Sequence, residues 1–342
     1  MLSLDCSNGG QMFRSALGLS VFSHTPFEAQ KIRASRPKPG LKPQHLASLK
    51  TCANVCAALV SNARLESQLV SFSPGTLKDA NLQVNVGTAG SISLLLQSLL
   101  LPGLKASLKL RVQGGTDVPF SPSFRFVDKV LFPKLNESGA HFSLSLQRRG
   151  YFPKGLGMEV FESRPCKSLF PFSISDLGSL QKVELYSHCA SLPKEIVSNQ
   201  LKSCAKLLEK ELHCDIFPFE ENKPSPSLGS GVDAFAFFSS GSILSATALG
   251  ERGKSALKVG EECARALLEQ ISFGAPCDVH LADQLIPFMA VADGFSSIEC
   301  KISQHLLDNV KVCESFLPVK FEVKGLLDEK GEVSVTGSAF KL

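Results

Sequence analysis

Short strand-like runs, glycine-containing turns and amphipathic helical stretches follow one another along the 342-residue chain. Apolar positions recur at helical spacing, and shorter runs alternate as strands do. The pattern predicts helices at residues 11–21, 92–100 and 123–135, and strands at 83–86, 107–112, 142–147 and 320–324. Such a recurring unit is typical of an α/β or α+β fold with a mixed sheet.

The pattern changes over the middle of the chain. It predicts helices at 194–212 and 257–271, a loop rich in Pro, Ser and Gly at 222–231, and a strand at 234–238. We interpret residues 181–274 as a smaller inserted α/β domain. Residues 1–180 and 275–342 would then form one large domain.

Composition narrows the class of protein. Apolar residues make up 44% and charged residues 20%, which argues against disorder and against a fibrous repeat. The formal charge of +4 restricts any nucleic-acid site to a local basic patch. With 24 Phe, two Tyr and no Trp, the chain favours core packing over a stacking platform for single strands.

Targeting and cysteine signals are weak. The start of the chain lacks a charged region followed by an apolar one, and no run approaches the ~18 apolar residues of a membrane span. We therefore expect a protein that is neither secreted nor membrane-spanning.

The eleven cysteines form no C-x-x-C pair, so Cys52 and Cys56 are expected to be buried thiols in a reducing compartment.

Two segments suit phosphate groups. The first is a loop whose prolines and glycine exclude helix and whose cations cluster around one turn. Its cations are Lys31, Arg33, Arg36, Lys38 and Lys42. The second is the turn at 87–91, which opens a helix and offers backbone N–H groups to an anion. A solvated loop and an ordinary helix start remain the alternatives.

Gln97 is a polar residue on an otherwise apolar helix, so it needs a partner.

Near the C-terminus, Ser303 is a predicted N-cap, which places His305 in the first turn of a helix. A helix amino end favours neutral imidazole and attracts phosphate, and both effects suit a nucleophilic histidine. Asp283 and Gln284 are adjacent on another predicted helix and could hold an adenosine or orient the imidazole. A hydrogen-bonded structural histidine is the alternative.

The segment from Gly250 to Ser255 resembles part of a phosphate-binding P-loop. That motif requires a glycine five residues before Gly253, where Ala248 stands. A turn that caps the next helix is the better interpretation.

Together these segments resemble the RNA 3′-terminal phosphate cyclase family along essentially the whole chain. The matching segments are GGQMFRSALGLS at 9–20, KIRASRPKPGLKPQHL at 31–46, GTAGSISLLLQ at 87–97, GGTDVPFSP at 114–122, RRGYFPKGLG at 148–157, HLADQL at 280–285 and QHLLDNV at 304–310. The occurrence of all seven segments in the family's order is stronger evidence for the resemblance than any single segment.

The resemblance implies a large domain of repeated βαβαββ units, similar to the C-terminal domain of translation initiation factor 3, with a smaller inserted domain. It also implies ATP-dependent conversion of an RNA 3′-phosphate to a 2′,3′-cyclic phosphate. His305 would attack the α-phosphorus of ATP and carry AMP as a phosphoramidate. RNA with a 3′-phosphate end and ATP are then the expected partners, with Mg²⁺ or Mn²⁺ as the expected metal, to which no residue is assigned.

Site residues follow from the same resemblance. The residues that match nucleotide-contacting positions are Gln97, Pro122, His280, Asp283 and Gln284. The candidates for binding phosphate groups are Arg14, Arg33 and Arg36.

The chain departs from the family pattern in three places. His280 replaces a usual tyrosine, Ser7 stands where a metal-placing glutamate is usual, and Leu156 interrupts a glycine triplet.

Three functions follow from these patterns. We favour an active cyclase, because His305 is present and the cyclase-like group without activity lacks that histidine. The second is such a catalytically silent scaffold in pre-ribosomal RNA processing, and the third is an unrelated NTPase that uses the turn at 250–255. An RNA-processing role suggests the nucleoplasm, with the cytoplasm as the alternative.

Overall fold

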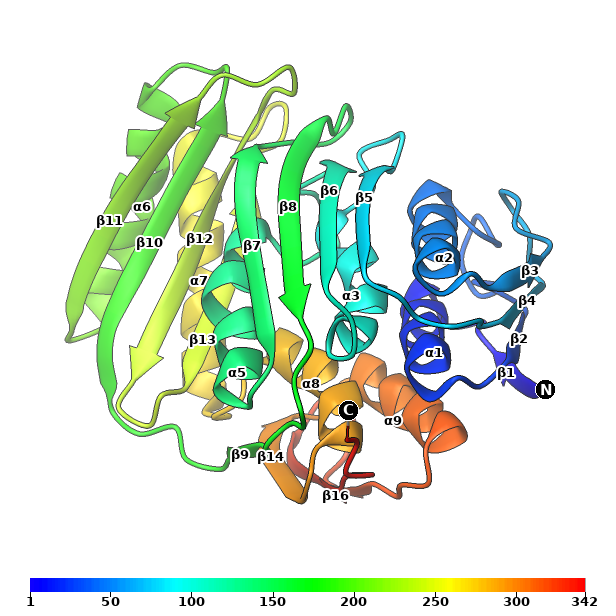
Figure 1. The fold of residues 1–342 in the computed structure, drawn as a ribbon. Coiled ribbons are helices and arrows are strands. Elements are labelled where there is room, and N and C mark those ends of the chain that lie inside the picture. Colours follow the sequence, from blue (N-terminus) through cyan, green and yellow to red (C-terminus); the bar gives the residue numbers. More distant parts are fainter. Residues whose placement is uncertain (342) are drawn as a thin grey trace.

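The computed structural model describes residues 1–341, so the last residue of the predicted segment 275–342 lies outside the described residues. Over that range the chain forms four four-stranded mixed sheets with helices packed between and against them (Figure 1). The architecture is α/β, as predicted from the alternation of strands and helices. No helix within residues 1–341 is both long enough and apolar enough to cross a membrane.

The first two sheets arise from consecutive βαβαββ units. The first unit contains β1 (Leu2–Asp5), α1 (Gly10–Ser23), β2 (Phe27–Gln30), α2 (Pro43–Cys56), β3 (Leu59–Ser61) and β4 (Val70–Ser73). The second contains β5 (Ala80–Asn85), α3 (Ile92–Gly103), β6 (Leu108–Gly114), α4 (Phe124–Phe126), the π-helical turn Val127–Leu131, α5 (Phe132–Glu137), β7 (His141–Arg148) and β8 (Gly157–Arg164). In both sheets the strand order is first, second, fourth, third.

A third unit has the same strand order but is interrupted. It contains β9 (Ser173–Ile174), α8 (Val279–Val291), β14 (Phe295–Lys301), α9 (Gln304–Phe316), β15 (Glu322–Lys324) and β16 (Lys330–Thr336). β9 pairs in parallel with β14, although more than a hundred residues separate them in sequence. The repeated pattern of strand order is the structural counterpart of the recurring unit read from the sequence.

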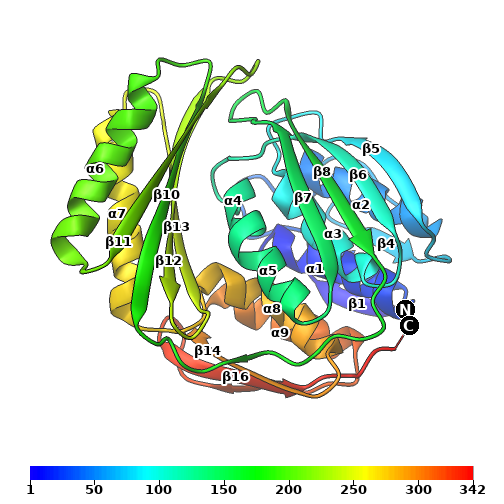
Figure 2. The same ribbon diagram turned by 60° about the vertical axis from the view of Figure 1, so that its left-hand side comes forward.

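The interruption forms the fourth sheet. Its elements are β10 (Leu180–Ala190), α6 (Glu195–Glu211), β11 (Asp215–Lys223), β12 (Gly229–Phe238), β13 (Ile243–Leu249) and α7 (Ala256–Phe273). Both helices cover one face of this sheet (Figure 2) and share an apolar cluster with it that includes Val183, Leu208 and Leu267. The division of the chain into two domains stays a prediction.

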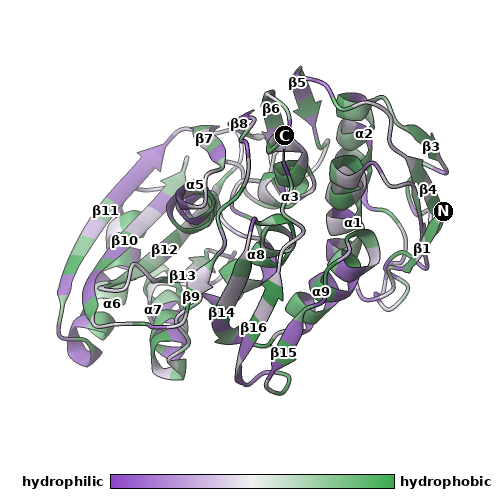
Figure 3. Cartoon of the chain, turned by 60° about the horizontal axis from the view of Figure 1, so that its bottom comes forward, coloured by the Kyte–Doolittle hydropathy of each residue, from purple (hydrophilic) through white to green (hydrophobic). Residues whose placement is uncertain are grey.

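The opposite face of the fourth sheet packs on the rest of the molecule. Phe235 of β12 is fully buried in the main apolar core rather than in the cluster under α6 and α7. The outer strand β11 is mostly hydrophilic (Figure 3) and contains Pro218, which suits an edge strand because proline cannot donate to a further strand.

The interior of the main core is helical. α1 packs against α3 and α9, and α9 packs against α8. The contact of α1 with α3 is close at Gly18, where a Cβ atom would lie 3.2 Å from the backbone oxygen of Ser98. α3 is almost entirely apolar, and the side chain of Ser91 caps it by accepting a hydrogen bond from the Leu94 N–H.

Most predicted elements are present with shifted ends. The predicted loop at 222–231 is wrong at both ends, because β11 continues to Lys223 and β12 begins at Gly229. The long strand β10 pairs with both, and its Ala190 lies opposite Lys223 on one side and Gly229 on the other. Glycine is needed at 229 because a Cβ atom there would lie 2.1 Å from the ring of Tyr151. The expected strand at 320–324 is shorter and comprises only Glu322–Lys324.

The cysteines fit the expectation of a reduced protein. Cys52 and Cys56 are free and buried, and the Cys56 thiol donates to the backbone oxygen of Cys52. Burial raises the pKa of the Cys52 thiol to about 12, so this thiol stays protonated and unreactive.

Asp278 joins the inserted sheet to α8. It is fully buried, and one carboxylate oxygen caps α8 by accepting from the N–H groups of His280 and Leu281. The other oxygen accepts from the backbone N–H and the hydroxyl of Ser245 on β13, at 2.8 and 2.7 Å.

Replacing this carboxylate should destabilise the whole chain. We expect Asp278→Ala to lower the free energy of unfolding by about 2–4 kcal/mol, because it removes a helix cap and leaves buried donors unpaired. Urea-induced unfolding followed by circular dichroism measures this. Asp293→Ala, at an exposed position, is the control and should change stability by less than about 0.5 kcal/mol.

Candidate active site

His305 is the second residue of α9, and its side chain is exposed. Ser303 precedes the helix as its N-cap and accepts a hydrogen bond from the Leu306 N–H at 3.0 Å. The imidazole therefore lies beside the free N–H groups at the amino end of a 13-residue helix, where partial positive charge favours an anion.

Ser303 also ties α9 to α8. Its hydroxyl donates to the carboxylate of Asp283 while it caps α9. One turn beyond His305, the side-chain amide of Asn309 donates to the backbone oxygen of Asp283 at 2.6 Å and accepts from the Ser15 hydroxyl of α1 at 2.7 Å. These bonds fix the position of His305 relative to Asp283, so the structure brings these two predicted site residues together.

The carboxyl group of Asp283 has an unusual protonation state. Burial raises its pKa to about 6, and the negative charges of Asp278 and Asp308 act in the same direction. The hydrogen bond from Ser303 and the charge of His280 oppose this shift. Asp283 is therefore partly protonated near pH 6 and can donate as well as accept a hydrogen bond.

The environment of His305 favours neutral imidazole. Partial desolvation lowers its pKa, and the positive charges of Arg14, Arg36 and His280 lower it further, although Asp308 raises it. Because their charges act on the His305 imidazole, Arg14 and Arg36, two of the predicted phosphate-binding arginines, lie close to it. A neutral imidazole keeps a nitrogen lone pair for nucleophilic attack.

Arg14 is a buried cation without an acidic partner. Its side chain lies on α1, and its Nε donates to Oε1 of Gln97 at 3.1 Å, which supplies the partner that Gln97 needs on its apolar helix. Burial and the charge of Arg33 lower the pKa of Arg14 to about 10. No acidic side chain in residues 1–341 forms an ion pair with Arg14, so an anion would stabilise it.

Arg33 and Arg36 belong to the proline-containing loop before α2. Arg33 Nη1 donates to the backbone oxygens of Lys38 and Gly40, so part of this guanidinium holds the loop together. Arg36 is exposed, and a Cβ atom at Gly9 would lie 3.4 Å from its Nη2. The loop therefore folds back on the amino end of α1, and Arg36 reaches the same region as Arg14.

His45 is a site feature that the sequence patterns did not single out. Its Nδ1 accepts from the Lys42 N–H at 3.0 Å, so the neutral ring carries its hydrogen on Nε2. Burial, then the charges of Arg14, Arg33 and Lys42, lower its pKa to about 3. A Cβ atom at Gly10 would lie 2.1 Å from Nε2, so only glycine admits this donor beside Arg14.

The predicted nucleotide-contacting residues surround this region. Gln97 and Gln284 line one narrow cavity of about 30 Å³ between α1, α3, α8 and α9, together with Asn309. His280 is exposed at the start of α8, edge-on to Phe126 at 6.2 Å between ring centroids. Pro122 lies in the loop after β6, and its backbone oxygen accepts from Ser93 at the start of α3.

The turn at 87–91 does not provide the expected anion cradle. The N–H groups of Gly87, Gly90 and Ser91 already donate to side chains, those of Asn85, Thr88 and Gln44 respectively. A larger hollow of about 600 Å³ lies at the ends of β6, β7 and β8, and no predicted site residue lines it. Neither feature adds to the site at His305.

Carboxylates for a divalent metal are poorly placed near His305. Ser7 offers only a hydroxyl, and the exposed Asp5 accepts from the Ser7 N–H and forms an ion pair with Lys31 at 3.0 Å. Asp308 is buried, and the side-chain amides of Asn8 and Gln304 donate to it. These residues do not form a ready cation site.

The turn at 250–255 is a helix cap, in agreement with the preferred interpretation. Ser255 caps α7 by accepting from the Lys258 N–H. Lys254 forms ion pairs with Glu262 at 2.8 Å and Glu251 at 3.3 Å, so its charge is already balanced. The alternative of an NTPase built on this turn loses its physical basis.

Known proteins similar to this chain share one family description. The model of the family described as RNA 3′-terminal phosphate cyclase matches residues 6–323. The chain belongs to the RNA 3′-terminal phosphate cyclase family. Among similar proteins of that name, the one from Methanopyrus kandleri is 36% identical over 335 residues, which cover 96% of this chain and 95% of that protein. The proteins from Ignicoccus hospitalis and Pyrococcus furiosus are each 37% identical, and the alignments cover 98% and 97% of this chain and 99% and 97% of those proteins.

The site residues that the sequence did not reveal are mainly residues that hold other site side chains in position. Ser303 was predicted as a cap, but its bond to Asp283 depends on how α8 packs on α9. Asn309 and His45 lie inside quoted motifs, yet nothing in their spacing indicates which groups they contact. Both are buried polar side chains in helices of mixed composition, so no sequence signal distinguishes them from their polar neighbours.

The protonation of Asp283 should appear in the pH dependence of stability. Its pKa rises from about 3.8 unfolded to about 6 folded, so the folded state binds more protons between these values and stability falls as pH rises through this window. We expect wild type to lose about 2 kcal/mol of unfolding free energy relative to Asp283→Asn between about pH 4 and pH 6. Urea titrations across that range measure it. A constant difference between the two proteins would contradict the assignment, and Asp293→Asn serves as the exposed control.

Proposed function

We propose that this protein converts an RNA 3′-phosphate end to a 2′,3′-cyclic phosphate at the expense of ATP, through a covalent adenylate on His305. The observation that carries the proposal is the exposed imidazole at the amino end of α9, whose neutral form is favoured by partial burial and then by nearby arginines. The relatives named RNA 3′-terminal phosphate cyclase support the reaction class.

In the first step, a ring nitrogen of His305 attacks the α-phosphorus of ATP. A phosphorus–nitrogen bond forms, the bond to the bridging oxygen breaks, and pyrophosphate leaves. Negative charge on the phosphate oxygens grows in this step, and fixed positive charge stabilises it. Arg14, Arg33 and Arg36 supply that charge, with Arg14 held in place by Gln97.

The adenosine would lie against the residues that surround α8. Gln97 and Gln284 present amides to one cavity, and Asp283 can act as donor or acceptor because its pKa is about 6. His280 and Pro122 offer flat and apolar contacts to the base. An imidazole at 280 has less stacking area than the usual tyrosine of the family, so a weaker hold on adenine is expected.

The last two steps use the RNA end. An oxygen of the RNA 3′-phosphate attacks the adenylate phosphorus, and His305 leaves with its lone pair restored. The neighbouring 2′-hydroxyl then attacks the 3′-phosphorus, the ring closes, and AMP leaves. Adenylation is needed because a phosphate monoester has no good leaving group, and closure is fast because the nucleophile belongs to the same nucleotide.

The family resemblance also implies Mg²⁺ or Mn²⁺, which would neutralise phosphate charge when bound with ATP. The residues around His305 do not fit a preformed site for that ion, since Asp5 is paired with Lys31 and position 7 is serine. We therefore assign the stabilisation of phosphate charge to the arginines and to the N–H groups at the start of α9.

The proposal predicts a covalent label. Incubation with ATP labelled in the α-phosphate and a divalent ion should give a protein-bound label that acid and hydroxylamine remove, as expected of a phosphoramidate. His305→Ala should abolish the label because the attacking nitrogen is lost. His213→Ala, at an exposed histidine after α6, is the matched control and should be labelled like wild type.

The alternative is a catalytically silent scaffold, which the serine at position 7 favours. In that case wild type would bind ribosomal precursor RNA without becoming labelled, and His305→Ala would leave RNA binding unchanged. Labelling that persists in a folded His305→Ala variant would contradict the assignment of the nucleophile.

A further inference from the structure

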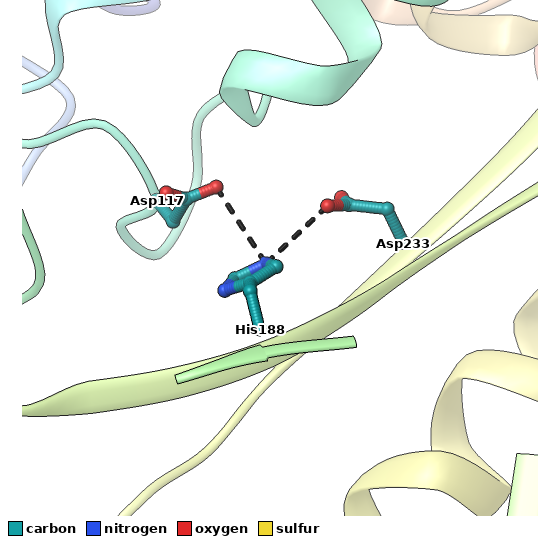
Figure 4. A group of neighbouring side chains, drawn as sticks. All are labelled: Asp117, His188 and Asp233. Carbon is teal, nitrogen blue, oxygen red and sulfur yellow. Dashed lines mark ion pairs between the residues drawn. The ribbon is translucent and has the colours of Figure 1, made fainter. Parts of the chain in front are cut away.

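A second cluster of chemically active side chains lies where the inserted sheet meets the repeat core. Asp117 follows β6 in the large predicted domain, His188 lies on β10 and Asp233 on β12 (Figure 4). All three side chains have no solvent exposure. None of them belongs to the region around His305, and the proposed reaction does not use them.

Three atoms of this cluster face one another, and His188 forms ion pairs with the two carboxylates only when its ring is protonated (Figure 4). His188 Nε2 lies 3.3 Å from Asp233 Oδ2 and 3.8 Å from Asp117 Oδ1, and the three atoms lie within 4.8 Å of one another. Among the described residues each of the three lacks a hydrogen-bond partner. Because a buried polar atom without a partner is destabilising, three such atoms facing one point indicate a missing ligand.

The other polar atoms of the same side chains are firmly held. Asp117 Oδ2 accepts from Arg149 Nη1 at 2.8 Å and from the Thr116 hydroxyl at 2.6 Å. Asp233 Oδ1 accepts from the Thr247 hydroxyl at 2.7 Å. These contacts orient each carboxylate so that its second oxygen faces the shared centre, as the outer contacts of metal ligands do.

The imidazole is oriented in the same way. His188 Nδ1 lies 2.8 Å from the hydroxyl of Tyr151, and the two rings stack with 26° between their planes. If Nδ1 carries the ring hydrogen and donates it to Tyr151, Nε2 keeps its lone pair for a ligand. A ligating histidine commonly donates its second ring N–H in this manner.

The charge around the cluster calls for a cation. Asp117, Asp233 and Glu221 are carboxylates, and Arg149 is the buried guanidinium that pairs with two of them. Arg125 reaches Glu221 only at 3.5 Å and is shared with Asp128. A divalent ion would balance the remaining negative charge of this buried cluster.

We propose that Asp117, His188 and Asp233 bind a divalent transition metal ion, for which Zn²⁺ is the best match. One imidazole nitrogen and two carboxylate oxygens are ligands that Zn²⁺ accepts at about 2.0–2.2 Å, and a water molecule would complete four-coordination. Ligands at that distance around a tetrahedral ion are about 3.4 Å apart, which is close to the 3.3 and 3.8 Å found.

A proton on Nε2 explains the arrangement less well. A protonated Nε2 would pair with Asp233 Oδ2 at 3.3 Å, but an N–H group satisfies one oxygen at a time and would leave Asp117 Oδ1, at 3.8 Å, without a partner. A bound ion satisfies all three atoms at once. It would also fasten the loop after β6, which carries Pro122, to two strands of the inserted sheet.

The test uses the full chain with any affinity tag removed, since a histidine tag would bind metal itself. Elemental analysis of the purified protein should find close to one zinc ion per chain. After treatment with a chelator, Zn²⁺ should bind with one-to-one stoichiometry in calorimetry and raise the midpoint of thermal unfolding. A folded protein that holds no ion and whose thermal midpoint Zn²⁺ does not raise would overturn the proposal.

Two variants identify the ligands. His188→Gln and Asp233→Asn should each weaken Zn²⁺ binding by about 100-fold or more, since each removes a direct ligand. Asp233→Asn keeps the shape and the bond to Thr247, so it should remain folded, and circular dichroism checks this. His213→Gln, at an exposed histidine, is the matched control and should bind as wild type does. Unchanged binding in folded Asp233→Asn would overturn the proposal.

Cysteines need a separate readout because the chain has eleven of them. Co²⁺ substituted into the site should show the visible bands of a nitrogen and oxygen site, without the near-ultraviolet charge-transfer band that thiolate ligands give. A strong charge-transfer band that survives in His188→Gln would place the metal on cysteines and overturn the assignment.

Discussion

The hydroxyl of Ser303 is the contact on which the candidate active site depends. It accepts from the Leu306 N–H in the first turn of α9 and donates to Asp283 on α8, so one side chain both caps the helix that carries His305 and fixes it against its neighbour. Asn309 and Ser15 extend the same connection to α1, which carries Arg14. The imidazole, the carboxyl group and the arginine are therefore placed by three helices that share one core, and loops contribute Arg33, Arg36 and Pro122.

Charge is arranged around that frame in a way that favours phosphate. Within residues 1–341 Arg14 is buried without an acidic partner, and partial burial, then the charges of Arg14 and Arg36, lower the pKa of His305. In an ordinary core a buried guanidinium would be paired, as Arg149 is with Asp117 and Glu221. An anion would balance the charge of Arg14. Arg149, in contrast, lies among more carboxylates than it can neutralise, so a cation would balance the charge there.

Much of this could be predicted from sequence because it is local. Residues close together in the sequence determine where α9 begins, its cap at Ser303 and the alternation of strands and helices. The family resemblance added the candidate roles of His305, Asp283 and Gln284. The remainder depends on contacts between distant segments. Asp117, His188 and Asp233 come from three separate stretches, and only the pairing of β10 with β12 and the packing of the inserted sheet bring them together. The turn at 87–91 failed as an anion cradle for the same reason, since Gln44 reaches it from another helix.

The proposed reaction requires the imidazole of residue 305 to become covalently joined to adenylate. Peptide mapping by tandem mass spectrometry detects this bond, after incubation of the native chain with ATP and quenching at alkaline pH. We expect an added AMP group on the α9 peptide, with fragments that assign it to His305. An AMP group assigned to a lysine or to another histidine, or its absence while RNA ends are still cyclised, would contradict it.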